Sequence, residues 1–335
     1  MNKNNKYKFV FESARKFLND IISKYPDLNN SILEKHLEHE SKFENILDAH
    51  RRLIESLSNR NMMASVIGFN RREKEMRSIL FGYNPTEILS AYKNADELLE
   101  KFRNKFSLQN AQGKRSLWRK FSEGIISGSN FMASFKNKDD FDSFIKTFAR
   151  NKYTKAALPM LLSKEVRGFG FALACDFLKE LGYREYPKPD VHLIKIFYSL
   201  ELSPSTEPYE VYKSIVEMSE VVGEDAYTVD KIFWLVSSGR FYLVNIDTGR
   251  NRDKFIKSVK VDLEKEFAAE PVNEIGSPAC RQAGIFSNTH RQLEKEAFGS
   301  PSARARQPIL SAKLNFLSLF REAERQKRAF LNFID

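Results

Sequence analysis

The sequence predicts an all-α fold, on the basis of its composition and of the spacing of its apolar residues. Gly and Pro are scarce, at 14 and 11 of 335 residues, whereas Phe is abundant at 28. Apolar residues recur at steps of three and four over most of the chain, which is the period of an amphipathic helix. Helices packed by aromatic side chains, with few strands, account for both features. The apolar fraction of 42% is enough for a sizeable core.

Residues 1–110 are expected to form an N-terminal helical region. Its first helix, FVFESARKFLNDIISKY, should end before the Asn29-Asn30 pair. Ser31 is then expected to be the N-cap of one long charged helix, SILEKHLEHESKFENILDAHRRLIESL. Two further helices are expected over NRREKEMRSILFG and EILSAYKNADELLEKFRNKF.

Residues 111–265 are expected to form the central helical core. Polar breaks lie at 107–115 (SLQNAQGKR) and 201–208 (ELSPSTEP). Between them, SLWRKFSEGIISGSNFMASF and KDDFDSFIKTFARNKY have helical spacing. EVYKSIVEMSEVV and YTVDKIFWLVSSG are the helices expected after the second break.

Residues 266–335 are expected to form a basic, partly irregular tail. Small, polar and basic residues interrupt the helical period there, until a final helix is expected over ILSAKLNFLSLFREAERQKRAFLNFI. The tail is interpreted either as a flexible basic arm that binds DNA or as an appendage unrelated to the core.

The chain carries a net charge of +10, with an isoelectric point near 9.3. An excess of Lys and Arg permits phosphate contacts and speeds encounters with nucleic acid, although it does not require them. The N-terminus has no apolar secretory signal, and no run of about 18 apolar residues predicts a membrane span. The protein is therefore expected to be soluble and cytoplasmic, with no membrane partner.

The cysteines and histidines predict no metal site. Cys175 and Cys280 are too few for a disulfide framework or for a four-thiolate iron–sulfur cluster. His36 and His39 lie three residues apart on a charged helix face, and no third ligand completes a zinc pattern.

The segment 156–182 predicts two helices joined by a tight hairpin. An apolar helix leads into Arg167-Gly168-Phe169-Gly170, and FALACDFLKELG follows as the second helix. Two glycines one residue apart permit a tight turn and remove side chains that would keep a phosphate away. The hairpin amides then point outward at the start of the second helix, where the helix dipole favours an anion. Phe169 would lock the helices together, and Arg167 could contact a phosphate directly.

The glycine pair has other interpretations when it is taken alone. Such a pair also ends many helices as a C-cap, so the hairpin alone does not establish a phosphate site. A dinucleotide-binding loop is excluded, because no strand precedes the glycines and a third glycine is missing.

A second motif, YPKPDVH, follows in the loop 183–192 and leads into another apolar helix. With this continuation the chain resembles the helix-hairpin-helix, Gly/Pro-rich loop and Asp superfamily of base-excision DNA glycosylases. In that superfamily the hairpin leads into a helix with a small residue, matched here by Ala174. A Pro-containing loop and an Asp-x-His segment then begin the next helix. The resemblance is strongest over 156–197, and a weaker agreement of helix order extends over roughly 60–260.

The resemblance implies two helical subdomains with a cleft between them, and a DNA glycosylase that flips a damaged or modified base. It also implies that Asp190 is the catalytic carboxylate. Cleavage of an N-glycosidic bond develops positive charge on the sugar, which a fixed carboxylate stabilises while it aligns a water molecule. The alternative, that Asp190 only caps its helix, accounts for its position but not for the hairpin that precedes it.

The chain also departs from parts of this superfamily. Members with combined glycosylase and lyase activity carry a Lys two residues after the second hairpin glycine, where this chain has Ala172. A monofunctional enzyme that uses water is therefore expected. Lys188 could replace that Lys as an amine nucleophile, or it could contact a phosphate or lie in solvent. His192 could lie near a phosphate or pack against a helix.

The expected partner is double-stranded DNA, bound by a monomer without a cofactor. Relatives that bind an iron–sulfur cluster have four cysteines after the Asp helix, and this chain has none between 176 and 279. The hairpin could hold a monovalent cation. Two alternatives remain: a non-catalytic helix-hairpin-helix module that binds DNA in repair or phage defence, and a helical protein-interaction scaffold. The scaffold predicts no salt-dependent affinity for DNA.

Overall fold

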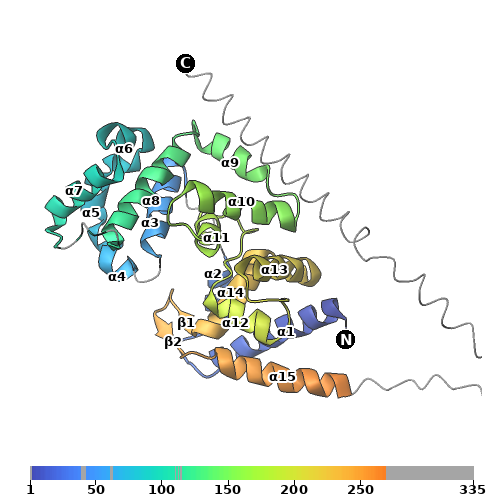
Figure 1. Ribbon diagram of the computed structural model, residues 1–335. Helices are drawn as coiled ribbons and strands as arrows, with labels where there is room; N and C mark the ends of the chain where they lie inside the picture. The colour runs from blue at the N-terminus through green and yellow to red at the C-terminus, as the bar shows by residue number, and fades with distance from the viewer. Residues whose placement is uncertain are drawn as a thin grey trace, which may run out of the picture. The chain divides into compact units, whose positions relative to one another are not determined.

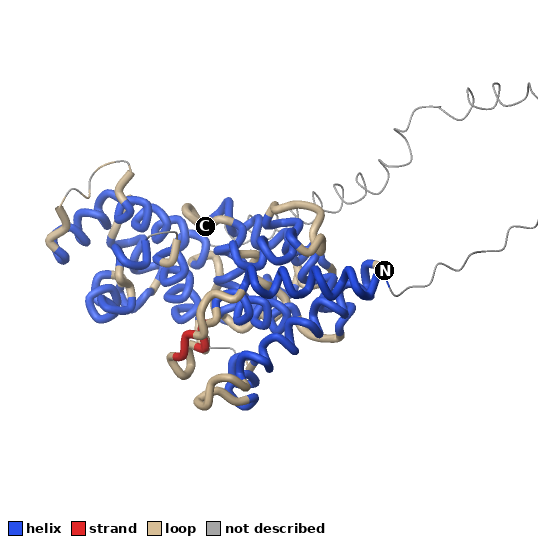
Figure 2. Tube along the Cα trace, turned by 90° about the horizontal axis from the view of Figure 1, so that it is seen from below, coloured by secondary structure: helices blue, strands red, loops and turns tan. Residues whose placement is uncertain are grey.

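A computed structural model of the protein describes residues 2–38, 43–60, 63–109, 111, 113 and 115–268. Their regular secondary structure is almost entirely helical (Figures 1 and 2). The exception is one short antiparallel hairpin of β1 (Arg240–Phe241) and β2 (Ile246–Asp247). The all-α fold class predicted from the sequence is confirmed. The tail expected at 266–335 lies outside the described residues, apart from the end of the last helix.

Asparagine side chains begin many of the helices. They cap the N-termini of α1, α2, α3, α6, α7, α9 and α10 by accepting hydrogen bonds from backbone amides that have no partner within the helix. The helices are α1 (Lys3–Ile22), α2 (Asn30–Leu37), α3 (Ile46–Ser58), α4 (Met63–Ile67), η1 (Asn70–Arg72), α5 (Glu73–Ile79), η2 (Phe81–Tyr83), α6 (Pro85–Ala91), α7 (Ala95–Phe106), α8 (Leu117–Met132), α9 (Lys138–Lys146), α10 (Lys152–Glu165), α11 (Phe171–Glu180), α12 (Val191–Ser199), α13 (Pro208–Val222), α14 (Ala226–Ser238) and α15 (Arg252–Ala268).

Two helices that were expected to be continuous are each divided in two. SILEKHLEHESKFENILDAHRRLIESL forms α2 and α3, and Asn45 caps α3. EILSAYKNADELLEKFRNKF forms α6 and α7, and Asn94 caps α7. The N-cap of α2 is Asn29, not the expected Ser31. In α2, α3 and α7 an Asn side chain accepts hydrogen bonds from the first amides of the helix. The spacing of apolar residues does not reveal where a new helix begins in this way.

The described helices surround two buried cores. The first core runs from Phe43 to Ala226 and draws mainly on α3 to α11. The second core joins α1 and α2 to α12, α14 and α15, which come much later in the sequence. Helix α13 contributes to both: Tyr212 lies in the first core and Ile215 in the second. The two helical subdomains that were expected are therefore present, and the cleft between them stays a prediction.

The helices of residues 1–110, which were expected to form one N-terminal region, contribute to both cores. Helices α1 and α2 belong to the second core, whereas α3 to α7 belong to the first. The boundary expected at residue 110 falls between α7 and α8, which pack directly against each other. The apolar face of α1 is covered by α13 and α14, so the partners of this helix cannot be inferred from its neighbours in sequence.

Met1–Phe267 forms one compact unit. Within the described residues, no helix combines the length and the apolar character needed to cross a membrane.

Candidate functional site

The glycine hairpin joins α10 to α11 by a tight turn. Gly168 has φ +95°, a conformation that L side chains rarely adopt, so the turn requires glycine at this position. The amide of Phe169 donates to the carbonyl of Val166 at 3.1 Å and closes the turn. The Phe169 side chain is buried, with its ring centroid 5.8 Å from that of Phe177. This residue therefore joins the hairpin to the first core.

The outer face of the hairpin is open. Gly170 is exposed, and a Cβ atom built on it would meet nothing within 4 Å. No side chain caps α11, and the first amides of a helix have no partner within the helix. Arg167, next to the turn, is exposed. The hairpin thus presents a helix N-terminus without a side-chain cap, and a cation, on a face that an anion can approach.

Two distant elements hold the hairpin in place, and the sequence did not indicate either of them. The amide of Arg167 donates to Ser127 Oγ of α8 at 2.8 Å. A Cβ atom on Gly124 would lie 2.8 Å from the Arg167 carbonyl oxygen, so only glycine lets α8 approach so closely. From the end of α3, Arg60 extends over Gly168, where a Cβ atom would lie 3.1 Å from Arg60 Nη1. Nothing in local spacing predicts these contacts.

Asp190 is the N-cap of α12. Its Oδ1 atom accepts the amides of His192 at 2.8 Å and Leu193 at 3.2 Å. Within the described part of the chain, Oδ2 has no hydrogen-bond partner. Val191, the first residue of α12, is 71% exposed, so solvent reaches this end of the helix. The carboxylate is therefore fixed by one oxygen and available through the other.

The loop that carries Asp190 is where the chain passes from the first core to the second. Helix α11 packs in the first core and α12 in the second. Pro187 and Pro189 are both buried, and neither has an amide N–H. The amide of Asp190 donates to the carbonyl of Lys188 at 2.8 Å, across Pro189. The amide of Lys188 donates to Asp230 Oδ2 of α14 at 2.6 Å.

A buried ionic cluster lies beside this loop. Lys179 Nζ is 3.2 Å from Asp230 Oδ2 and 3.8 Å from Asp176 Oδ1, and Lys188 Nζ is 3.2 Å from Asp176 Oδ1. Burial opposes the charge of Lys179, but the two carboxylates outweigh it and raise the pKa of the ammonium. Burial alone would raise the pKa of Asp176, yet Lys188 and Lys179 lower it. The cluster has two cations and two anions, which is why it tolerates burial.

The structure therefore gives Lys188 a different environment from a solvated lysine. Its side chain is 29% exposed and ion-paired with Asp176. A lysine nucleophile must direct its amine at the sugar, whereas Nζ of Lys188 is directed at Asp176. The contact argues against Lys188 as a nucleophile.

His192 packs against the end of α14. Its Nδ1 atom lies 2.7 Å from Ser237 Oγ. Burial lowers the pKa of His192, an effect that the Asp190 carboxylate opposes. The imidazole is therefore neutral near pH 7, so it would contribute a hydrogen bond rather than a charge.

A buried lysine on α14 lies in an aromatic cage that the sequence did not indicate. Lys231 Nζ lies 5.2, 5.5 and 5.1 Å from the ring centroids of Tyr227, Trp234 and Tyr242. It donates a hydrogen bond of 3.1 Å to the Tyr242 hydroxyl. Burial, with repulsion from Lys179, lowers the pKa of Lys231 to about 8. The adjacent charges Asp230 and Lys231 inside an otherwise apolar helix are the sequence signal for both buried clusters.

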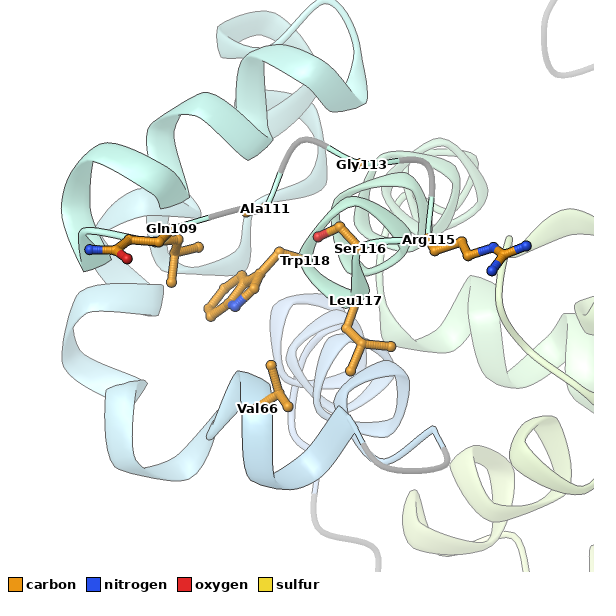
Figure 3. A pocket seen from close by; sticks show the side chains of 9 residues that line it. Val66, Gln109, Ala111, Gly113, Arg115, Ser116, Leu117 and Trp118 are labelled. Atoms are coloured by element: carbon orange, nitrogen blue, oxygen red, sulfur yellow. The ribbon is translucent and has the colours of Figure 1, made fainter.

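A pocket of about 500 Å³ lies elsewhere in the first core, at the segment between α7 and α8. Figure 3 shows Trp118 and Val66 facing each other across it, whereas the Arg115 side chain points away. Residues 110, 112 and 114 of this segment lie outside the described residues. No residue predicted for the site lines this pocket.

The histidines expected not to form a metal site are only partly described. His36 is buried, with Nδ1 at 2.7 Å from the Ile32 carbonyl, and its Nε2 accepts the amide of Leu243 at 3.4 Å. His39 lies outside the described residues. Among those that are described, no three His, Cys, Asp or Glu side chains form a group that could hold a metal ion.

Comparisons with known proteins give one structural likeness. No family model matches the chain, and no curated protein matches it. Among solved structures, the chain is similar to the crystal structure of Methanocaldococcus jannaschii 8-oxoguanine glycosylase/lyase in complex with 15mer DNA containing 8-oxoguanine. The match covers 69% of this chain and 98% of that chain, with 19% sequence identity and a TM-score of 0.44. We therefore infer function from the hairpin and from the surroundings of Asp190.

Proposed function

We propose that this chain is a DNA glycosylase that hydrolyses the N-glycosidic bond of a base flipped out of double-stranded DNA. The observation that supports this proposal best is the geometry of Asp190. Two backbone amides hold one carboxylate oxygen, while the other has no partner among the described residues and lies at a solvent-exposed helix end. A residue that served only as an N-cap would need only the first oxygen.

In the proposed reaction, Asp190 stabilises the positive charge that develops on the sugar as the bond from C1′ to the base nitrogen breaks. The base leaves with the electron pair of that bond and takes up a proton. A water molecule, aligned by Oδ2, adds to C1′ and gives up a proton. Carboxylate and water suffice for these steps, so we propose that the reaction requires no cofactor.

The hairpin supplies the proposed contact with the DNA backbone. The amides at the uncapped N-terminus of α11 donate to a phosphate, and Gly170 leaves the space that the phosphate needs. Arg167 is exposed beside this site, and Arg60 lies over Gly168. His192 could add a hydrogen bond from Nε2, if Nδ1 accepts from the Ser237 hydroxyl. Lys188 is held by Asp176, so its contribution to DNA binding is expected to be small.

The decisive variant is Asp190→Asn, because Asn is as good an N-cap as Asp. We expect its thermal stability and its affinity for DNA to match wild type, and base release to fall on the order of 10²- to 10³-fold. Mass spectrometry of bases released from a mixed-lesion duplex pool measures this and identifies the base. Asp225→Asn is the control for loss of a capping carboxylate elsewhere: Asp225 caps α14 by accepting the amide of Thr228 and also pairs with Arg184, so this variant should lose stability but not base release.

Two other outcomes would overturn this proposal. If wild type binds duplex DNA but releases no base from the pool, the chain is a non-catalytic helix-hairpin-helix module. If its affinity is the same at two salt concentrations, the chain does not bind DNA through phosphates, and the scaffold interpretation holds.

We further propose that the enzyme is monofunctional. A lyase forms an imine between a lysine and the sugar aldehyde, which borohydride reduces to a stable cross-link. Position 172 is Ala, and Lys188 is ion-paired. We expect no cross-link between protein and abasic DNA after borohydride treatment. A cross-linked product that persists in Lys188→Gln would direct attention to another lysine.

A further inference from the structure

The four residues that end in Asp190 contain only two amide donors, and both are used. Pro187 and Pro189 have no N–H, so Lys188 and Asp190 provide the donors. The Asp190 amide closes a three-residue turn on the Lys188 carbonyl, a turn that suits the fixed φ of Pro189. The Lys188 amide leaves the loop altogether and donates to Asp230. Of these two amides, that of Lys188 is the one that donates outside the loop, to a side chain of α14.

Asp230 is one of the most deeply buried charged residues that the structure describes, with 2% exposure. It lies on α14, and 2.6 Å separates its Oδ2 atom from the Lys188 nitrogen. The same oxygen accepts Lys179 Nζ at 3.2 Å. A buried carboxylate is costly, and an apolar residue of similar volume would fill the same space at lower cost. What an apolar residue could not do is accept the Lys188 amide.

We propose that Asp230 is a positioning residue that fixes the Asp190 carboxylate through the backbone of Lys188. Asp230 holds the Lys188 amide, the Lys188 carbonyl holds the Asp190 amide, and Asp190 then caps α12 with Oδ1. Each step restricts rotation of the next peptide, so the direction of Oδ2 is set from α14. Lys179 has a supporting role, because it neutralises the buried carboxylate. The catalytic consequence of this inference rests on the proposed function, whereas the geometric part does not.

Two double variants separate the hydrogen bond from the charge. Asp230→Asn/Lys179→Met removes both charges but keeps a carbonyl oxygen that can accept the Lys188 amide. Asp230→Leu/Lys179→Met removes the charges and also the acceptor, with a side chain of nearly the same shape. Both leave the ion pair between Lys188 and Asp176 intact. Any difference in exchange or in kcat between the two variants therefore measures the effect of losing the acceptor for the Lys188 amide.

The first measurement is native-state hydrogen exchange at the amides of Lys188 and Asp190, which needs no substrate. We expect exchange close to wild type in Asp230→Asn/Lys179→Met and roughly tenfold faster in Asp230→Leu/Lys179→Met, the factor expected for one lost hydrogen bond. The second is steady-state base release, in which kcat should fall about tenfold or more in the Leu variant while KM stays within about threefold. A merely structural role would change stability and leave kcat alone.

Val229→Ala is the control for general destabilisation, because Val229 is fully buried in the second core on the same helix. It should lower the melting temperature without selectively increasing exchange at 188 and 190. Equal exchange and equal kcat in the two double variants would overturn the inference while the proposed function stood. If wild type released no base but the Leu variant alone loosened the loop, the proposed function would fail and the geometric role of Asp230 would stand.

Discussion

Gly168 and Gly170 lie two residues apart, but the structure requires them for different reasons. Gly168 has φ +95°, which is a property of the fold, and its side-chain position faces Arg60. Gly170 is the N-cap of α11, with φ −92° and ψ 167°, a conformation open to any residue. Its side-chain position faces open space. Gly168 is therefore needed for the backbone conformation of the turn, whereas Gly170 leaves space for a phosphate to approach it.

Gly168→Ala should destabilise the protein by about 1–2 kcal/mol, because an L side chain is strained at this φ. Urea-induced unfolding measures the change. Gly170→Ala, with ordinary φ and no neighbour within 4 Å, is the matched control and should cost less. Equal losses in the two variants would contradict the distinction drawn above.

Gly170→Asp should separate stability from DNA binding. An Asp at this position caps α11, which is worth a few tenths of a kcal/mol over Gly, and the melting temperature should not fall. The carboxylate would occupy the site of a phosphate, so affinity for duplex DNA should drop about tenfold or more. Gly170→Asn caps the helix without a charge and should bind DNA with intermediate affinity. Unchanged affinity in both variants would show that the hairpin does not contact DNA.

At the scale of the element, α8 supports the hairpin with small residues. Gly124 permits the approach to the Arg167 carbonyl, and a Cβ atom on Gly128 would lie 2.6 Å from Leu53 of α3. Ser127 accepts the Arg167 amide between them. Glycine inside a helix costs about 0.5–1 kcal/mol relative to Ala, and close packing on two sides offsets that cost here.

Gly124→Ala should destabilise the protein by about 1–3 kcal/mol, although Ala is the better helix former. The methyl group would lie 2.8 Å from a backbone oxygen, which cannot move without shifting the hairpin. DNA affinity should fall as well, because the hairpin is displaced. Thermal unfolding and a DNA titration measure the two effects, and a stabilised variant would contradict the packing described for α8.

The sequence predicted those parts of the fold and of the candidate site that depend on adjacent residues. The helices, the hairpin and the loop of Asp190 follow from local spacing and from turn residues. The helix breaks at Asn45 and Asn94 could not be predicted in this way, because the sequence does not distinguish an Asn inside a charged helix from an Asn that caps the start of a new one. Arg60 was missed because only tertiary packing brings it to the hairpin. The charge of Asp230 inside an apolar helix is visible in the sequence, but its contact with the Lys188 amide is not.

At the scale of the whole unit, a buried histidine joins three separate elements of the first core. His50 of α3 is fully buried, with Nδ1 at 2.8 Å from the carbonyl of Tyr83 in η2. Its Nε2 atom lies 3.2 Å from Ser129 Oγ of α8. Burial lowers the pKa of His50 to about 4, although the hydrogen bond to the carbonyl opposes this. The folded protein therefore contains the neutral imidazole.

The free energy of unfolding should fall as the pH decreases from 6.5 toward 4. In that range the unfolded chain binds a proton at His50 and the folded chain does not. The contribution of His50 to the free energy of unfolding is therefore fully present above pH 6.5 and is lost as the pH falls toward the pKa of the folded state. The loss amounts to about 3 kcal/mol from this residue. The lowered pKa values of His36 and His192 act in the same direction. Urea unfolding between pH 4.5 and 7.5 measures the slope, which His50→Gln should reduce, and an unreduced slope would exclude His50 as its source.

The second core consists of helices from the two ends of the described chain. The Tyr7 hydroxyl donates to the carbonyl of Leu202, and the Tyr227 hydroxyl donates to the carbonyl of His36, across 195 and 191 residues of sequence. During synthesis α1 therefore leaves the ribosome long before the helices that cover it, and its apolar face stays uncovered until those helices have been made. Closing such long loops slows folding, so amides of α3 to α11 should gain protection earlier than those of α1. Until α12 to α15 emerge, the uncovered face of α1 is where an unfinished chain would stick to its neighbours or recruit a chaperone.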